Sequence, residues 1–227
     1  MYQKSYGIIF EVGGPIGMFA RPDSGSEPCS YPVPTPTAAF GIMQSILRVK
    51  SASIQIEAIG ICHRPEYLDY AFNSWSSIRK EGQKRDGNAC QIKATALLRP
   101  RFQICATAKR STVEPPHPKY AHINCAHSYR DQFYRRLSKE QYYRMPTLGP
   151  SDFFSDYVGL PITPIISDYN EILHGYVLQY FDKKNGYIMQ FPITETLRIA
   201  HGILQLGPEK VIAANGILKF ENENLNK

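Results

Sequence analysis

Apolar and polar residues alternate along this chain in patterns that predict several strands. The apolar run at 6–12 predicts a first strand. Residues 53–62 predict a second strand, and because the apolar positions change parity midway, we expect a β-bulge there. Two further runs, 91–98 and 102–108, flank the tripeptide Arg99-Pro100-Arg101. This pattern predicts a hairpin with the tripeptide at its tip.

The segment 30–47, SYPVPTPTAAFGIMQSIL, predicts a rigid extended stretch that leads into a helix. Its prolines fix φ and disfavour helix in the residues before them. Thr35 stands at the N-cap position, and Pro36 occupies the first helical position, where no N–H is needed. Because Gly41 has no side chain, we expect another backbone to lie close to it. The free N–H groups at the start of this helix suit a phosphate.

A second helix is predicted from Asn124 to about Lys139, with Ala126, Phe133 and Leu137 facing inward. Residues 67–88 lose all periodicity and are polar and charged, which indicates a long insertion between strands. The order of strands and helices therefore predicts an α+β fold, with a ferredoxin-like, RRM-type domain.

The pattern changes after Gly159. Two runs rich in β-formers flank Asn185-Gly186, a dipeptide typical of type I′ hairpin turns. Residues Thr194–Gln205 predict a short helix. We therefore expect two units: an RRM-like RNA-binding domain over 1–158, and a small, mostly antiparallel β appendage over 159–227.

Composition narrows the class of partner. The 227 residues carry a formal net charge of +6, which favours a polyanion. The 15 Tyr and 11 Phe add stacking surface, and aromatic rings with arginines are what single-stranded RNA binding requires. The alternative use of these rings is the hydrophobic core.

The cellular location follows from two absences in the sequence. The N-terminal apolar run is too short for a signal peptide or a membrane span. The five cysteines are an odd number without a CxxC pair, which is typical of reduced thiols. We expect a cytoplasmic protein with no membrane partner.

Basic residues beside turns, helix ends and tyrosines are the best candidates for RNA contacts. Arg48 and Lys50 have a structural alternative, because a helix C-terminus favours cations. Adjacent arginines on the second helix point to different sides, so one can bind RNA while the other forms a salt bridge. The predicted RNA-binding residues are Arg21, Tyr31, Thr35, Arg48, Lys50, Arg99, Arg101, Arg135, Arg136 and Arg144.

Three collinear stretches carry a family resemblance: 6–47, 91–108 and 133–159. Together they resemble the Cas-five family, the RAMP-type CRISPR-associated subunits of Cascade-like complexes, and most of all its subtype I-C branch. The resemblance implies a ribonucleoprotein subunit that caps the 5′ handle of crRNA. It also implies docking on the backbone subunit and other effector subunits, and access to target DNA or RNA through the complex.

The resemblance to the subtype I-C branch further implies metal-free cleavage of the crRNA precursor, by a Tyr on the first helix and a Lys-His pair on the second. Here Leu47 stands at the Tyr position, and Ser128 and Tyr129 stand at the Lys-His positions. We therefore expect RNA binding without family-type cleavage. The alternative is a metal-independent endoribonuclease with a rearranged site made of His127, Tyr129 and Arg130.

No cofactor is expected. His122, Cys125 and His127 are close in sequence, but a structural zinc site usually needs a second pair of ligands, and none follows. The sequence contains no phosphate-binding loop, nucleophile elbow or zinc-protease motif. A third reading is an RRM-like RNA-binding protein outside CRISPR defence.

Overall fold

The computed structural model describes residues 5–25, 27–74, 90–111, 123–184 and 187–225. Mainly antiparallel strands form a seven-stranded sheet, a three-stranded sheet and a two-stranded sheet. The predicted α+β class is confirmed at this level. The seven-stranded sheet has the order β7 (Tyr157–Gly159), β1 (Tyr6–Gly13), β6 (Arg101–Arg110), β3 (Ala52–Ile61), β10 (Ile203–Gln205), β9 (Tyr187–Ala200) and β8 (Glu171–Lys184).

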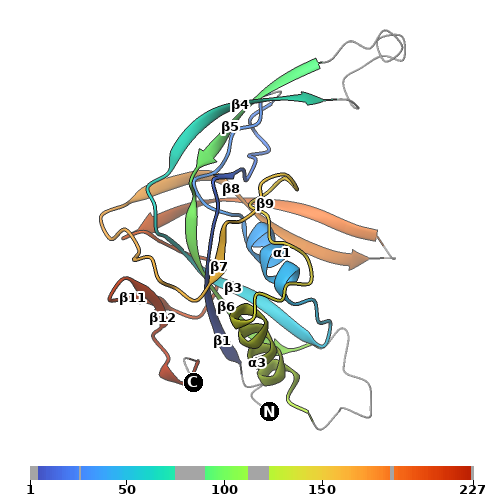
Figure 1. Cartoon of the computed structure of the whole chain (residues 1–227), viewed down its shortest axis with the longest axis vertical. Coiled ribbons are helices and arrows are strands. Elements are labelled where there is room, and N and C mark those ends of the chain that lie inside the picture. Colours follow the sequence, from blue (N-terminus) through green and yellow to red (C-terminus); the bar gives the residue numbers. More distant parts are fainter. Residues whose placement is uncertain (1–4, 26, 75–89, 112–122, 185–186, 226–227) are drawn as a thin grey trace.

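Two helices, α1 (Pro36–Ile46) and α3 (Cys125–Ser138), cover one face of this sheet (Figure 1). Their buried side chains join those of the central strands in one apolar cluster. Phe133 of α3 meets Phe10 of β1 edge to face, with ring centroids 5.3 Å apart. The main core therefore lies between the helices and β1, β6 and β3.

Local signals place both helices as predicted. The Thr35 side chain accepts a hydrogen bond from the Ala38 N–H (3.2 Å), and Pro36 begins α1. At α3, the Asn124 side chain accepts from the His127 N–H (3.3 Å) and Lys139 is the C-cap. The expected bulge is also confirmed, because the register of β3 against β6 shifts between Ile56 and Ala58.

One expectation about α1 is wrong. Gly41 is exposed, and a Cβ built there meets no atom within 4 Å. No backbone therefore packs against this glycine among the residues that the structure describes. The buried side of α1 is formed by Ala39, Ile42, Met43 and Ile46 instead.

The opposite face of the sheet is covered by the two-stranded sheet of β11 (Val211–Ala214) and β12 (Ile217–Phe220), followed by a 3-10 turn at Glu223–Leu225 (Figure 1). Buried polar groups hold this cover in place. Glu11 of β1 accepts hydrogen bonds from the Ile162 and Thr163 N–H groups, at 2.7 and 2.8 Å. Gln103 of β6 donates to the Thr163 carbonyl (2.7 Å) and accepts from the Leu218 N–H (2.8 Å).

Glu57, at the β3 bulge, is a third buried anchor for the C-terminal part. Its carboxylate accepts from the Thr107 hydroxyl (2.5 Å) and the Glu209 N–H (3.1 Å). Burial raises the pKa of this carboxyl above its ordinary value. Because Glu57 is the extra residue at the bulge, it has no partner in the β3–β6 register, and its side chain can bind a distant loop.

The predicted hairpin at Arg99-Pro100-Arg101 is wrong. The strand before it, β5 (Cys90–Leu98), pairs with β4 (Glu66–Ser74) and β2 (Ile16–Gly17), whereas β6 pairs with β1 and β3. The backbone changes sheets at Arg99, which has a φ of +46°. Since β6 is buried on both faces, it takes the centre of the large sheet and needs a partner on each edge.

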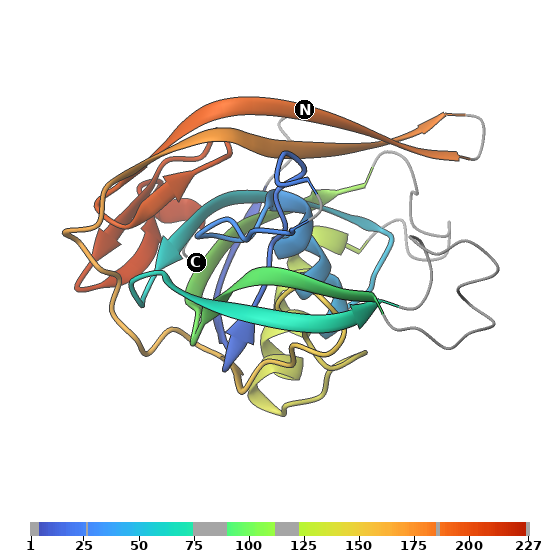
Figure 2. The same ribbon diagram turned by 90° about the horizontal axis from the view of Figure 1, so that it is seen from above.

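Two other element predictions need correction. Residues Thr194–Gln205 are not helical: they form the end of β9 and all of β10, joined by a turn at His201 and Gly202, both with positive φ. The first part of the expected insertion is strand β4, and 75–89 lie outside the described residues. Figure 2 shows the β8–β9 ribbon along one side of the molecule, well apart from the β4–β5 ribbon.

Candidate nucleic-acid interface

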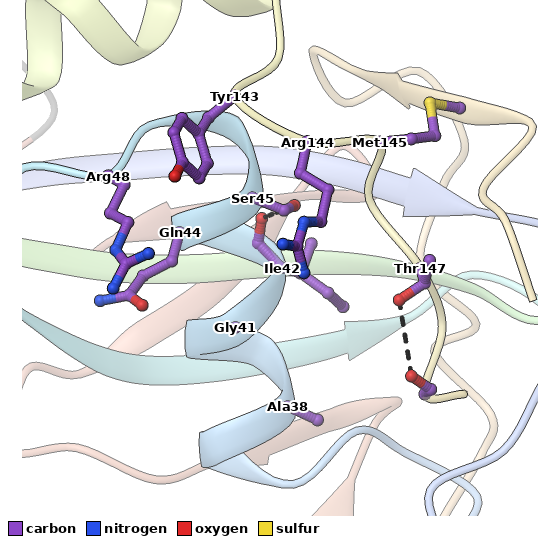
Figure 3. Close-up of a pocket in the computed structure, with 11 residues that line it drawn as sticks. Ala38, Gly41, Ile42, Gln44, Ser45, Arg48, Tyr143, Arg144, Met145 and Thr147 are labelled. Carbon is purple, nitrogen blue, oxygen red and sulfur yellow. Dashed lines mark hydrogen bonds between the residues drawn. The ribbon is translucent and has the colours of Figure 1, made fainter. Parts of the chain in front are cut away.

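A hollow of about 340 Å³ lies beside the C-terminal half of α1 and is called the α1 hollow below. One wall is α1 itself, and the other is the segment that follows α3 (Figure 3). Its volume lies within the range of about 300–1,000 Å³ that is usual for ligand sites. The lining residues are Ala38, Gly41, Ile42, Gln44, Ser45, Arg48, Tyr143, Arg144, Met145, Thr147 and Gly149.

The two walls are joined through the last carbonyls of α1, which have no partner within the helix. The Arg144 N–H donates to the Ser45 carbonyl (2.8 Å), and the Tyr143 N–H donates to the Ile46 carbonyl (3.2 Å). The Tyr129 hydroxyl of α3 donates to the Leu47 carbonyl (3.2 Å). These bonds fix Tyr143 and Arg144 against α1.

The far end of the second wall is also anchored. Leu148 is fully buried, and its carbonyl accepts from the Met18 N–H (2.8 Å). Gly149 has a φ of +108°, and a Cβ there would collide with the Met18 carbonyl. Only glycine fits this position, so the wall is held at a fixed distance from the N-terminal strands.

The α1 hollow is basic, and its arginine side chains are placed to contact an anion. Its lining contains Arg48 and Arg144 and no acidic residue. Both arginines are exposed, and neither has a carboxylate partner among the described residues. The Tyr143 ring is 59% exposed, with the Arg48 guanidinium 6.0 Å from its centroid. An anion with an adjacent flat ring fits this combination.

Most of the other predicted arginines are engaged within the protein. Arg21 pairs with Asp23 (2.8 Å), and Arg99 lies 3.8 Å from Glu66. Arg101 pairs with the buried Glu11 (3.4 Å) and donates to the Thr163 hydroxyl (3.2 Å). Arg136 donates to the Ile46 carbonyl of α1 (3.4 Å), whereas Arg135 is exposed.

The remaining predicted contacts lie apart from the α1 hollow. Tyr31 is 1% exposed and donates its hydroxyl proton to the Gly175 carbonyl (2.6 Å), so its ring is packed inside the fold. Thr35 caps α1 at its N-terminal end. Lys50 is exposed beyond the C-terminal end of α1.

Two of the three candidate catalytic residues lie together, because the Arg130 guanidinium is 3.4 Å from the His127 imidazole, whereas Tyr129 is buried. Tyr129 is 2% exposed, and burial raises the pKa of its hydroxyl above its ordinary value. His127 faces outward, 3.2 Å from Asp131, and Arg130 lies over the Tyr6 ring at 5.4 Å. Leu47 contacts Tyr129 but is itself buried, and it offers no group that can transfer a proton.

Sequence reasoning missed part of this site. Gln44, Ser45 and Met145 line the α1 hollow beside the predicted Arg48 and Arg144. The helical spacing of Gly41, Gln44 and Ser45 places them on one side of α1, and this spacing was the available signal. Met145, in the segment after α3, carries no comparable signal.

His122 lies outside the described residues, and the Cys125 thiol donates to the Ile123 carbonyl at 3.6 Å. Within the described ranges, no group of three or more His, Cys, Asp or Glu side chains is placed to hold a metal ion. No helix in the same ranges is long and apolar enough to cross a membrane.

Comparison with known proteins gives consistent matches. Residues 7–127 match the family model described as CRISPR-associated protein (Cas_Cas5). The chain is 30% identical over 155 residues to the protein of Thermus thermophilus named CRISPR pre-crRNA endoribonuclease Cas5d. That match covers 63% of this chain and 59% of the relative, so the chain spans less than two thirds of the relative's length.

Two solved structures resemble the fold. One, a CRISPR-associated protein, has a TM-score of 0.66 at 13% identity, with 91% of this chain and 95% of that chain covered. The other, a functionally uncharacterized protein from Streptococcus mutans, has a TM-score of 0.63 at 12% identity, with the same coverage. At these identities the likeness concerns the fold alone.

Proposed function

Because the chain belongs to the Cas5 family of CRISPR-associated proteins, we propose that it binds and caps the 5′ handle of crRNA and docks on the backbone subunit of an effector complex. The observation that carries this proposal is the α1 hollow, where two arginines without carboxylate partners among the described residues flank an exposed tyrosine. Phosphates would contact the guanidinium groups, and the ring would stack on a base.

The topology supports a ferredoxin-like, RRM-type core. Its strand–helix–strand–strand–helix–strand order is β1, α1, β3, β6, α3 and β7, with β2, β4 and β5 inserted. An RRM binds RNA on the open face of its sheet. Since β11 and β12 cover that face here, we place the RNA on the helical side of the sheet, at the α1 hollow.

The two-unit division, 1–158 and 159–227, is part of the same proposal. The antiparallel strands after Gly159 support a β-rich second unit. The pairing of β10 with β3 attaches this unit to the sheet of the first. Docking on the backbone and other effector subunits, and access to a DNA or RNA target, are proposed from family membership alone.

Substitution of Gly41 tests the α1 hollow without damage to the fold. Gly41→Leu puts a side chain into the open space of the hollow and should lower the affinity for RNA at least tenfold. The free energy of unfolding should rise by about 0.5–1 kcal/mol, because glycine is a poor helix former. The matched control, Gly41→Ala, should gain similar stability and keep its RNA affinity. Binding of crRNA handle and thermal melting measure the two effects.

If Gly41→Leu melts at a higher temperature but binds the handle RNA as the wild type does, the α1 hollow is not the RNA site. If Gly41→Leu melts below the wild type, the leucine clashes with a neighbour, and the space beside Gly41 is not open.

The second candidate function is cleavage of the crRNA precursor, because the Thermus thermophilus relative is named an endoribonuclease. We expect the purified chain not to cut its repeat RNA within the handle, with or without EDTA. General acid–base catalysis needs a titratable group within reach of the reacting oxygen. Leu47 lacks one, and the Tyr129 hydroxyl is buried and bonded to a carbonyl.

Gel analysis of the incubated repeat RNA measures this prediction. Single-site, metal-independent cleavage that His127→Ala abolishes would instead assign the endoribonuclease function. Cleavage that persists in His127→Ala and Tyr129→Phe would indicate a contaminating nuclease, or a site elsewhere in the chain.

A further inference from the structure

The first half of β1 has a partner strand on one side only. β6 pairs with all eight residues of β1, whereas β7, on the other side, pairs only with Glu11, Val12 and Gly13. An edge strand presents a row of N–H and C=O groups to which a further strand can pair. Among the residues that the structure describes, the edge of β1 over residues 6–10 therefore lacks a partner strand.

Pro161 ends the pairing of β7 with β1. Gly159 is the last residue of β7 and lies opposite Glu11. Two residues further along this register, Pro161 would lie opposite Ile9, but proline has no N–H to donate to the Ile9 carbonyl. The chain leaves the sheet instead, and the Ile162 N–H donates to the buried Glu11 carboxylate (2.7 Å). The open edge is therefore fixed by the sequence of this segment.

The unpaired edge groups belong to Gly7 and Ile9. The Ile9 N–H donates to the Tyr134 hydroxyl (2.9 Å), which donates in turn to the Ile9 carbonyl (3.3 Å). Since backbone groups alternate between the two sides of an antiparallel strand, Gly7 directs its N–H and C=O to the same edge. Gly7 is buried, and no described residue bonds to these groups on that edge. Buried backbone groups are nearly always paired, so this edge is suited to a ligand.

A groove of about 990 Å³ runs along this edge and is called the β1-edge groove below. Gly7 and Ile9 line it between α3, which covers one face of the sheet, and β12, which covers the other (Figure 1). Its volume lies at the upper end of the range of about 300–1,000 Å³ that is usual for ligand sites. The β12 side is largely apolar and includes Ile217, Leu218 and Phe220.

We infer that the β1-edge groove binds an extended segment of a partner polypeptide, which adds to the sheet as a strand beside β1. The backbone of this segment bonds to Gly7 and replaces the Tyr134 hydroxyl at Ile9. Main-chain hydrogen bonds give such a complex its affinity, and alternate side chains give it specificity. Side chains that face β12 meet an apolar surface, whereas those that face α3 meet Arg130 and Asp131. The segment therefore alternates apolar and polar residues.

The charges in the groove favour an acidic polypeptide over a nucleic acid. Arg130 lies 3.4 Å from Asp131, and Glu221 pairs with Lys210 at 2.8 Å. Lys219 is exposed and has no carboxylate partner among the described residues. A carboxylate on the β12-facing side of the segment complements this lysine. A polyanion would meet the two acidic side chains that line this groove, whereas the α1 hollow has none.

Fluorescence anisotropy on the full chain tests the inference with a fluorescein-labelled heptapeptide. The peptide has threonine at alternate positions, valine at the others, and one glutamate in place of a valine. Two N-methylated forms keep every side chain: one lacks the N–H groups of the threonines, and the other lacks the remaining N–H groups. Because only alternate residues of an added strand bond to β1, one form should bind at least about tenfold more weakly and the other as the parent peptide does.

Tyr134→Phe removes the hydroxyl that the segment has to displace from Ile9, so this variant should bind the peptide about tenfold more tightly than the wild type. The matched control is Tyr142→Phe, which loses a hydroxyl that donates to the Val158 carbonyl (3.2 Å) outside the groove. It should bind as the wild type does. Lys219→Glu should weaken binding of the glutamate peptide, and a peptide with lysine in place of glutamate should restore it.

Equal binding of the parent peptide and both N-methylated forms would overturn strand addition, and so would the absence of binding to both the wild type and Tyr134→Phe. An affinity of Tyr134→Phe no higher than that of Tyr142→Phe would exclude Ile9 from the site. Dimers of the chain that the peptide dissociates would assign the groove to a second copy and overturn the choice of partner. The β1-edge groove and the α1 hollow share no lining residue, so the peptide should leave binding of the crRNA handle unchanged.

Discussion

Charge reversal at both arginines of the α1 hollow, Arg48→Glu with Arg144→Glu, is expected to weaken binding of the crRNA handle by at least about a hundredfold. A hydrogen bond to a charged group contributes about 1.5–3 kcal/mol, and two such contacts are lost. Loss of two phosphate contacts should also make the slope of log affinity against log salt shallower by about 1.4 for a single strand. Titrations at several salt concentrations measure both quantities.

The control is a second double reversal, Arg64→Glu with Lys219→Glu, which changes the net charge equally. Arg64 pairs with Asp168 at the surface (2.5 Å), and Lys219 lies on β12, so neither lines the hollow. We expect this control to lose at most a little of its affinity for the handle RNA. An equal loss in both double variants would mean that only the net charge attracts RNA, and that the α1 hollow has no special part.

Glu11→Ala is expected to lower the free energy of unfolding by about 3–5 kcal/mol, because it leaves a buried charged network without its acceptor. Glu11 is fully buried, forms an ion pair with Arg101 (3.4 Å), and accepts hydrogen bonds from two N–H groups and from the Thr163 hydroxyl (2.7 Å). For a chain of this length, the melting temperature should fall by about 10 °C. Thermal and urea unfolding measure the change.

Asp168→Ala is the control for this prediction, since it removes one partner of an exposed ion pair. Such a pair contributes about 0–1 kcal/mol, so the melting temperature should barely move. If Glu11→Ala unfolds like the wild type, the segment around Thr163 is not held to β1 through this carboxylate. The covering of the sheet face by the C-terminal strands would then need another explanation.

The sequence by itself determined the features that depend on neighbours within a few residues. Thr35 and Pro36 specify the start of α1, because the cap bond and the proline act within one turn. Asn124 does the same for α3. The parity change in β3 revealed the bulge, because side chains alternate strictly along a strand.

Strand partners required the tertiary structure. Two apolar runs joined by three residues fit a hairpin, yet β5 and β6 lie in different sheets. The pairing is decided by which arrangement buries both faces of β6, and this depends on β1, β3 and the helices. The same holds for Thr194–Gln205, where the β3 edge is available to β10.

For the candidate site, the sequence supplied Arg48 and Arg144 among ten predicted RNA contacts but could not rank them. Arg101 and Arg48 look alike in sequence, and only the fold brings Glu11 to Arg101 and leaves Arg48 without a carboxylate among the described residues. Gly41 shows the same limit: its missing side chain was evident, but whether backbone or open space faces it was not. Charge pairing and open space are set by residues distant in sequence, so only the tertiary structure decided them.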